Sequence, residues 1–102
     1  MKIIKELEEF IADELSGAYD YAKMAVKYKT ENPDMARMFY EMANAELSHK
    51  DNLHKMIVSK IEEYKKQHGT PPVAMQAVYD WEHEKQIAET AEIKAMLDSA
   101  NN

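Results

Sequence analysis

The chain has 102 residues, the length of one ordinary domain, and 13 basic against 19 acidic residues give it a net charge of −6. This acidic balance argues against nucleic acid or an anionic membrane surface as the main partner. Cysteine is absent, which excludes disulfides, thiolate nucleophiles and cysteine-held zinc or iron–sulfur centres. Any metal must therefore bind to Asp, Glu or His side chains.

The composition predicts an all-α fold. Hydrophobic residues make up 45% of the chain, whereas only two Gly and three Pro are available for the many turns of a β fold. The N-terminal residues are too acidic for a signal peptide, and no apolar run approaches the roughly 18 residues of a membrane span. We therefore expect a cytoplasmic protein with no membrane association.

Helix-ending signals fall at two places in the chain. Asn32 is a typical N-cap with Pro33 at the first helical position, and Gly69 is a typical helix stop followed by Thr70 as the next N-cap. Both connections are short, which favours antiparallel neighbours within a single domain spanning residues 1–102. The expected helices cover about residues 3–30, 33–68 and 71–98.

Each expected helix carries a stripe with the helical spacing of three and four residues, which is typical of a face turned toward a partner helix. In the first helix the stripe is Leu7, Ile11, Glu14, Ala18, Tyr21, Ala25 and Tyr28, and in the second it is Met35, Phe39, Met42, Glu46, His49, Leu53 and Met56. In the third helix it is Ala74, Ala77 or Val78, Trp81, Glu84, Ala88, Ala91 and Ala95. Ionisable residues thus interrupt the first two stripes.

Glu46 and His49 form a Glu-x-x-His pair, whose spacing points both side chains the same way along a helix. A carboxylate on an apolar face needs a cation, a hydrogen-bond network or a metal, because burying it alone costs several kcal/mol. Glu14 and His49 lie equally far from the first turn, so at a rise of about 1.5 Å per residue they sit level in an antiparallel hairpin. Glu14, Glu46 and His49 can therefore converge, and the Glu-x-x-His spacing would suit two ligands of one metal.

Over about residues 7–58 the sequence resembles the ferritin-like family, in particular rubrerythrin-type and encapsulated-ferritin-like proteins. Their first helix has a Glu followed seven residues later by Tyr, as Glu14 and Tyr21 are here, and their second has a Glu-x-x-His, as Glu46 and His49 are. The resemblance implies that both Glu residues and His49 bind metal. It also implies that Tyr21 is a nearby phenol with a supporting or redox role in catalysis.

The resemblance further implies a di-iron centre, with manganese as an alternative metal. Family members of full length have a second Glu and a second Glu-x-x-His on two more helices, whereas this chain has one more helix. Asp80, His83 and Glu84 are the nearest candidates on it, but helical rise places His83 and Glu84 about 10 Å from the site, and their role stays open. A homodimer, or a higher oligomer, supplies the missing half more simply.

The implied reaction is oxidation of Fe(II) by dioxygen or peroxide, by a ferroxidase or a peroxidase-type oxidoreductase. Two alternatives remain at this point. Glu46 and His49 alone could form a buried acid–histidine ion pair without metal. The chain could also be a metal-free helical interaction protein that uses the Ala-lined third helix and Trp81 as a docking surface.

Overall fold

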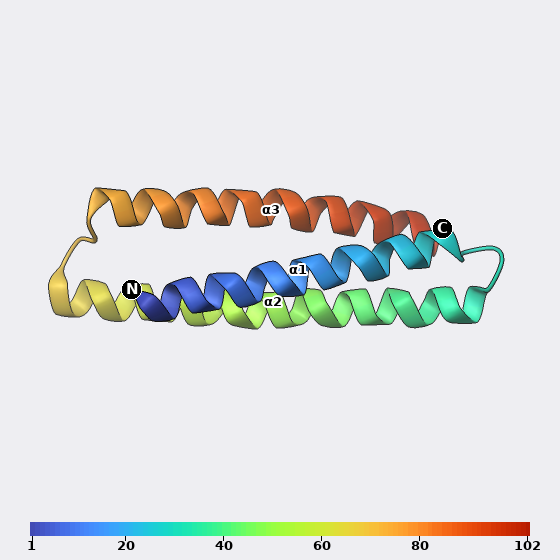
Figure 1. Cartoon of the computed structure of the whole chain (residues 1–102), viewed down its shortest axis with the longest axis horizontal. Coiled ribbons are helices and arrows are strands. Elements are labelled where there is room, and N and C mark those ends of the chain that lie inside the picture. The colour runs from blue at the N-terminus through green and yellow to red at the C-terminus, as the bar shows by residue number, and fades with distance from the viewer.

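A computed structural model describes residues 1–102 as three α-helices with no strand, which confirms the all-α prediction. The helices are α1 (Lys2–Lys27), α2 (Pro33–His68) and α3 (Val73–Asn101). They lie side by side in a rod of 55 × 17 × 17 Å. The helices α1 and α2 form an antiparallel hairpin, and α3 lies along α1 and runs in the same direction as α1 (Figure 1). None of the helices contains a stretch long and apolar enough to cross a bilayer.

Local sequence explains where α1 and α2 end. The Asn32 side chain accepts a hydrogen bond from the Met35 backbone N–H at 3.2 Å, and Pro33 follows it as the first residue of α2. Gly69 ends α2 with a positive φ of 78°, a backbone conformation that side chains disfavour. The first helix ends at Lys27 rather than near residue 30, because a turn occupies residues 28–31.

The third helix begins at Val73, two residues later than predicted, and runs to Asn101 rather than 98. Pro72 disfavours a helical conformation of the residue before it, and Pro72 itself is extended with ψ 144°. Pro71 and Pro72 therefore form a non-helical connection, and the helix starts after it.

The core fills the space between α1 and α2 and the inner side of α3. Its main members are Leu7, Ile11, Leu15, Ala18, Ala22, Ala43, Leu47, Ile57, Ile61, Ile93 and Leu97. Leu15 and Leu47 are buried, whereas Glu14 and Glu46 lie at the edge of the core and keep part of their surface in water. The buried faces of the first two helices thus differ from the predicted stripes by a rotation of about one residue.

The face predicted for the third helix is wrong. Its Ala-rich stripe with Trp81 is exposed, and the buried residues are Gln86, Thr90, Ile93 and Leu97. Alanine contributes little area to either face, so the larger apolar side chains decide which side packs. Two polar contacts support this packing: the Gln86 amide donates to Glu8 on α1, and the Lys29 ammonium donates to the Ser99 carbonyl oxygen at 2.8 Å.

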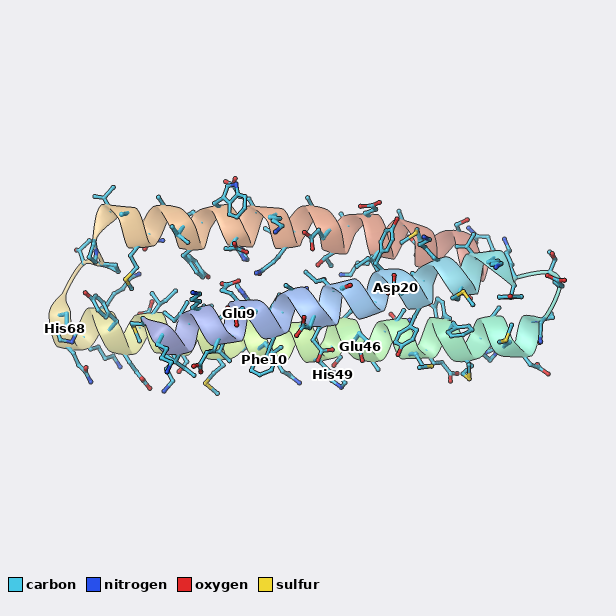
Figure 2. All side chains as sticks on the ribbon, in the orientation of Figure 1. Glu9, Phe10, Asp20, Glu46, His49 and His68 are labelled. Atoms are coloured by element: carbon cyan, nitrogen blue, oxygen red, sulfur yellow. The ribbon has the colours of Figure 1, made fainter.

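The third helix covers one long side of the α1–α2 hairpin and leaves the opposite side bare. We call this bare side the open face. Phe10, Glu46 and His49 lie on it, directed away from α3 (Figure 2). The residues predicted to bind metal are therefore accessible from outside the chain.

Candidate metal centre

The open face brings together Glu14 from α1 and Glu46 and His49 from α2. The Nδ1 atom of His49 lies 3.3 Å from Oε2 of Glu14 and 3.8 Å from Oε1 of Glu46. These residues form the only group of three in the chain whose potential ligand atoms all lie within 4.8 Å of one another. The side chains are 25%, 27% and 55% exposed for Glu14, Glu46 and His49, so the cluster is a shallow surface site.

His49 is the only basic side chain within ion-pair distance of the two carboxyl groups of this cluster. The pKa of Glu46 lies above its ordinary value, chiefly because its carboxyl shares a hydrogen bond with Glu14. Partial burial and the negative charge of Glu14 raise this pKa further, whereas His49 opposes the rise. No Lys or Arg forms an ion pair with either residue. A cation would relieve the repulsion, and two carboxylates with an imidazole are donors that suit iron or manganese.

Comparison with known protein families shows to which family this chain belongs. The family model for rubrerythrin matches residues 5–100, nearly the whole chain. The chain belongs to the rubrerythrin family. This match confirms the resemblance inferred from Glu14, Tyr21, Glu46 and His49, and extends it over α3. The comparisons with curated proteins and with solved structures found no match.

Gly17 makes room for one carboxylate of this rubrerythrin-family site. A glycine inside a helix costs roughly 0.5–1 kcal/mol relative to alanine, so its presence in α1 needs a reason. A Cβ atom at this position would lie 3.2 Å from Oε2 and 3.7 Å from Cδ of Glu46. The missing side chain lets Glu46 lie against α1 and approach Glu14. Gly17 was not used in the sequence analysis, although a lone glycine inside a predicted helix was a visible signal.

We expect Gly17→Ala to separate helix stability from metal binding. The metal-free protein should keep its stability or gain up to about 1 kcal/mol, because Glu46 can swing away and alanine favours the helix. Displacement of Glu46 should lower Mn(II) affinity by roughly threefold to tenfold, measured by calorimetric titration beside thermal unfolding. Ser16→Ala, a small change at the exposed neighbouring position, is the control. Equal affinities in the two variants would show that Glu46 does not need this space.

Tyr21 lies two helical turns beyond Glu14 on the same side of α1. Its ring is half-buried and stacks on Phe39 of α2, with ring centroids 6.0 Å apart and an angle of 26° between the rings. No hydrogen bond links Tyr21 to Glu14, Glu46 or His49. The structure thus shows a packing role for Tyr21, and its catalytic role stays a prediction.

The candidates on α3 do not join the cluster of Glu14, Glu46 and His49, which comes from α1 and α2 alone. Asp80 accepts a hydrogen bond from the Gln76 side chain at 2.9 Å, and Glu84 is exposed. The ring of His83 stacks on that of His54 of α2, with centroids 4.7 Å apart. A second ligand set for a di-iron centre is therefore absent from the single chain.

Proposed function

We propose that this rubrerythrin-family protein binds iron through Glu14, Glu46 and His49 and supports oxidation of Fe(II) by dioxygen or peroxide. The observation that carries the proposal is the convergence of these three donor groups from two helices, with no Lys or Arg paired to either carboxyl group. Two bound Fe(II) ions would supply the two electrons that, together with two protons, reduce one hydrogen peroxide to two waters. Manganese is the other metal that suits the same donors. We keep the cytoplasm as the proposed location.

The proposal includes a second copy of the chain, because three donor residues make half of a di-iron site. Di-iron carboxylate bundles use one Glu from each of two helices and a Glu-x-x-His from each of the other two. One copy offers one Glu on α1 and one Glu-x-x-His on α2. Two copies facing each other through the open face would supply the whole set, with α3 of each copy on the outside.

The apolar surroundings of the cluster support this pairing. Phe10, one turn before Glu14 on α1, is 57% exposed. Met42 and Met56 lie seven residues before and after His49, so they share its side of α2, where Met42 is half-buried and Met56 exposed. An exposed apolar patch around a polar centre is typical of a surface that binds another protein.

Glu14→Gln tests the proposed ligand set. The substitution keeps the size of the side chain but removes the negative charge, so metal affinity should fall at least tenfold, or about 1.4 kcal/mol. Titration calorimetry with Mn(II) or Co(II), or with Fe(II) under nitrogen, gives the affinity. Glu9→Gln removes the same charge from an exposed position of the same helix and should leave affinity unchanged. Equal affinities in both variants would exclude Glu14 as a ligand.

A second candidate function is a metal-free helical interaction protein, and the exposed outer side of α3 favours it. Trp81 is 60% exposed there, in the Ala-rich stripe that packing leaves bare. This candidate predicts that protein produced with abundant iron holds none. Metal analysis of the purified protein separates the two functions.

A further inference from the structure

A second polar cluster lies between α2 and α3, apart from the metal cluster. The rings of His54 and His83 stack across this seam with 4.7 Å between centroids and an angle of 15°. Tyr79 stacks on His83 in turn, at 5.9 Å. Beside the two imidazoles lies a cavity of about 290 Å³, which Lys50 and Lys94 also line.

The charges around this cavity are mainly positive, although the chain as a whole carries −6. Asp51 is the only acidic residue of the lining, and Lys50 already pairs with it at 2.7 Å. Lys94 has no ion-pair partner in the chain. One unpaired ammonium and two imidazoles thus border the same cavity.

Polar groups at the seam also lack partners. The Thr90 hydroxyl and Nδ1 of His83 are the only buried side-chain polar atoms of the chain without a hydrogen bond. Buried polar groups nearly always have a hydrogen-bond partner, so these two atoms between α2 and α3 have unused hydrogen-bonding capacity in the free chain. The pKa of His54 is lowered, first by burial and then by the positive charge of His83 and Lys50, against a small opposing effect of Asp51.

We propose that this cavity binds a small tetrahedral oxyanion, such as phosphate free or as a monoester, between α2 and α3. Its volume of about 290 Å³ is ample for such an ion. The ammonium of Lys94 and the imidazole N–H groups of His54 and His83 are charge-assisted donors for it. A divalent cation is disfavoured, because both Lys side chains repel it and no third ligand lies close enough to the His pair.

A bound oxyanion would join two helices that otherwise touch little, because α3 packs mainly on α1. Binding only the folded chain, it would raise the unfolding temperature in a saturable way. This effect would differ from ordinary salt screening, which weakens surface ion pairs without saturating at a single site.

The site should also respond to pH, because protonated imidazoles add positive charge and donors. Every charged neighbour of the pair bears on this response. His54 faces Lys50 and Asp51 on α2 and His83 on α3, and His83 faces Glu8 of α1 as well as His54. Lys94 of α3 lines the cavity beside both rings. An anion favours the protonated pair, so oxyanion affinity should rise as pH falls.

Imidazole NMR of the full chain, with metal removed by a chelator, tests the proposal. Inorganic phosphate should shift the His54 and His83 signals in a saturable way and leave those of His49 and His68 unchanged. Chloride at equal ionic strength is the control and should not produce the saturable shift. Sulfate, which keeps two charges throughout, should bind at least about threefold more tightly near pH 6 than near pH 8. Glycerol phosphate in place of phosphate shows whether the cavity also admits esters.

Three variants complete the test. Lys94→Ala should weaken phosphate binding roughly tenfold, whereas Lys66→Ala, the loss of one exposed lysine far along α2, should have no effect. Thr90→Val should keep or raise the unfolding temperature, since it removes an unpartnered buried hydroxyl without changing size. Shifts that do not saturate, equal affinities in the two lysine variants, or a response of the pair to Zn(II) but not to phosphate would overturn the proposal.

Discussion

Substituting alanine for both Glu46 and His49 should abolish Fe(II) oxidation and leave the metal-free protein folded. The change removes two of the three donor groups and leaves Glu14 alone on the open face. Both side chains are partly exposed, at 27% and 55%, so little packing is lost. Removing Glu46 also ends its repulsion with Glu14, so the free energy of unfolding should change by less than about 1 kcal/mol. Ferric absorbance after adding Fe(II) in air measures oxidation, and thermal unfolding measures stability.

A matched control removes the same two residue types elsewhere on α2. Glu41 and His68 are both exposed and lie outside the cluster, so Glu41→Ala with His68→Ala should leave oxidation intact. A structural ion pair between Glu46 and His49 would give a different result. If Glu46→Ala alone strongly destabilises the metal-free protein and His49→Ala restores it, the pair is a structural ion pair rather than a metal site.

A charge placed at Phe10 should separate the two copies and thereby remove most of the iron affinity. Phe10 is 57% exposed in the single chain, so Phe10→Glu costs the monomer little. At an interface between two open faces it would bury an unpaired carboxylate, which costs several kcal/mol. We expect a monomer whose iron affinity is at least about tenfold weaker, although Glu14, Glu46 and His49 are unchanged. Light scattering and metal titration measure the two effects.

Trp81→Glu is the control for this experiment. Trp81 is similarly exposed, at 60%, but lies on the outer side of α3, away from the open face. It should leave both mass and iron affinity unchanged. If instead Trp81→Glu separates the copies and Phe10→Glu does not, the chain associates through α3, and the open face is not the shared surface.

Regular helix geometry made part of this structure predictable. Asn32 and Gly69 carry conformational preferences strong enough to mark helix ends from the sequence. The approach of Glu14 to His49 follows from equal distances to one turn, because helical rise hardly varies. An error of two residues in the turn would move either side chain only about 3 Å along the axis.

Features that depend on the packing of one helix against another were harder to predict from the sequence. An Ala-rich helix has no strongly apolar side, so the orientation of α3 depended on where Ile93 and Leu97 could be buried. The contact of Gly17 with Glu46 and the stacking of His54 on His83 each join residues of different helices. To predict such a contact, one must know how each of the two helices is rotated about its own axis. The spacing of apolar residues along the sequence gives that rotation only to within about one residue.

Molar mass in solution, measured together with iron content, tests the shared metal site most directly. Light scattering with and without Fe(II) gives the mass, and metal analysis of the same fractions gives the stoichiometry. A site completed by a second copy predicts that iron shifts the protein toward a dimer or larger assembly, with about one iron per chain. A monomer that holds two irons per chain would contradict the account.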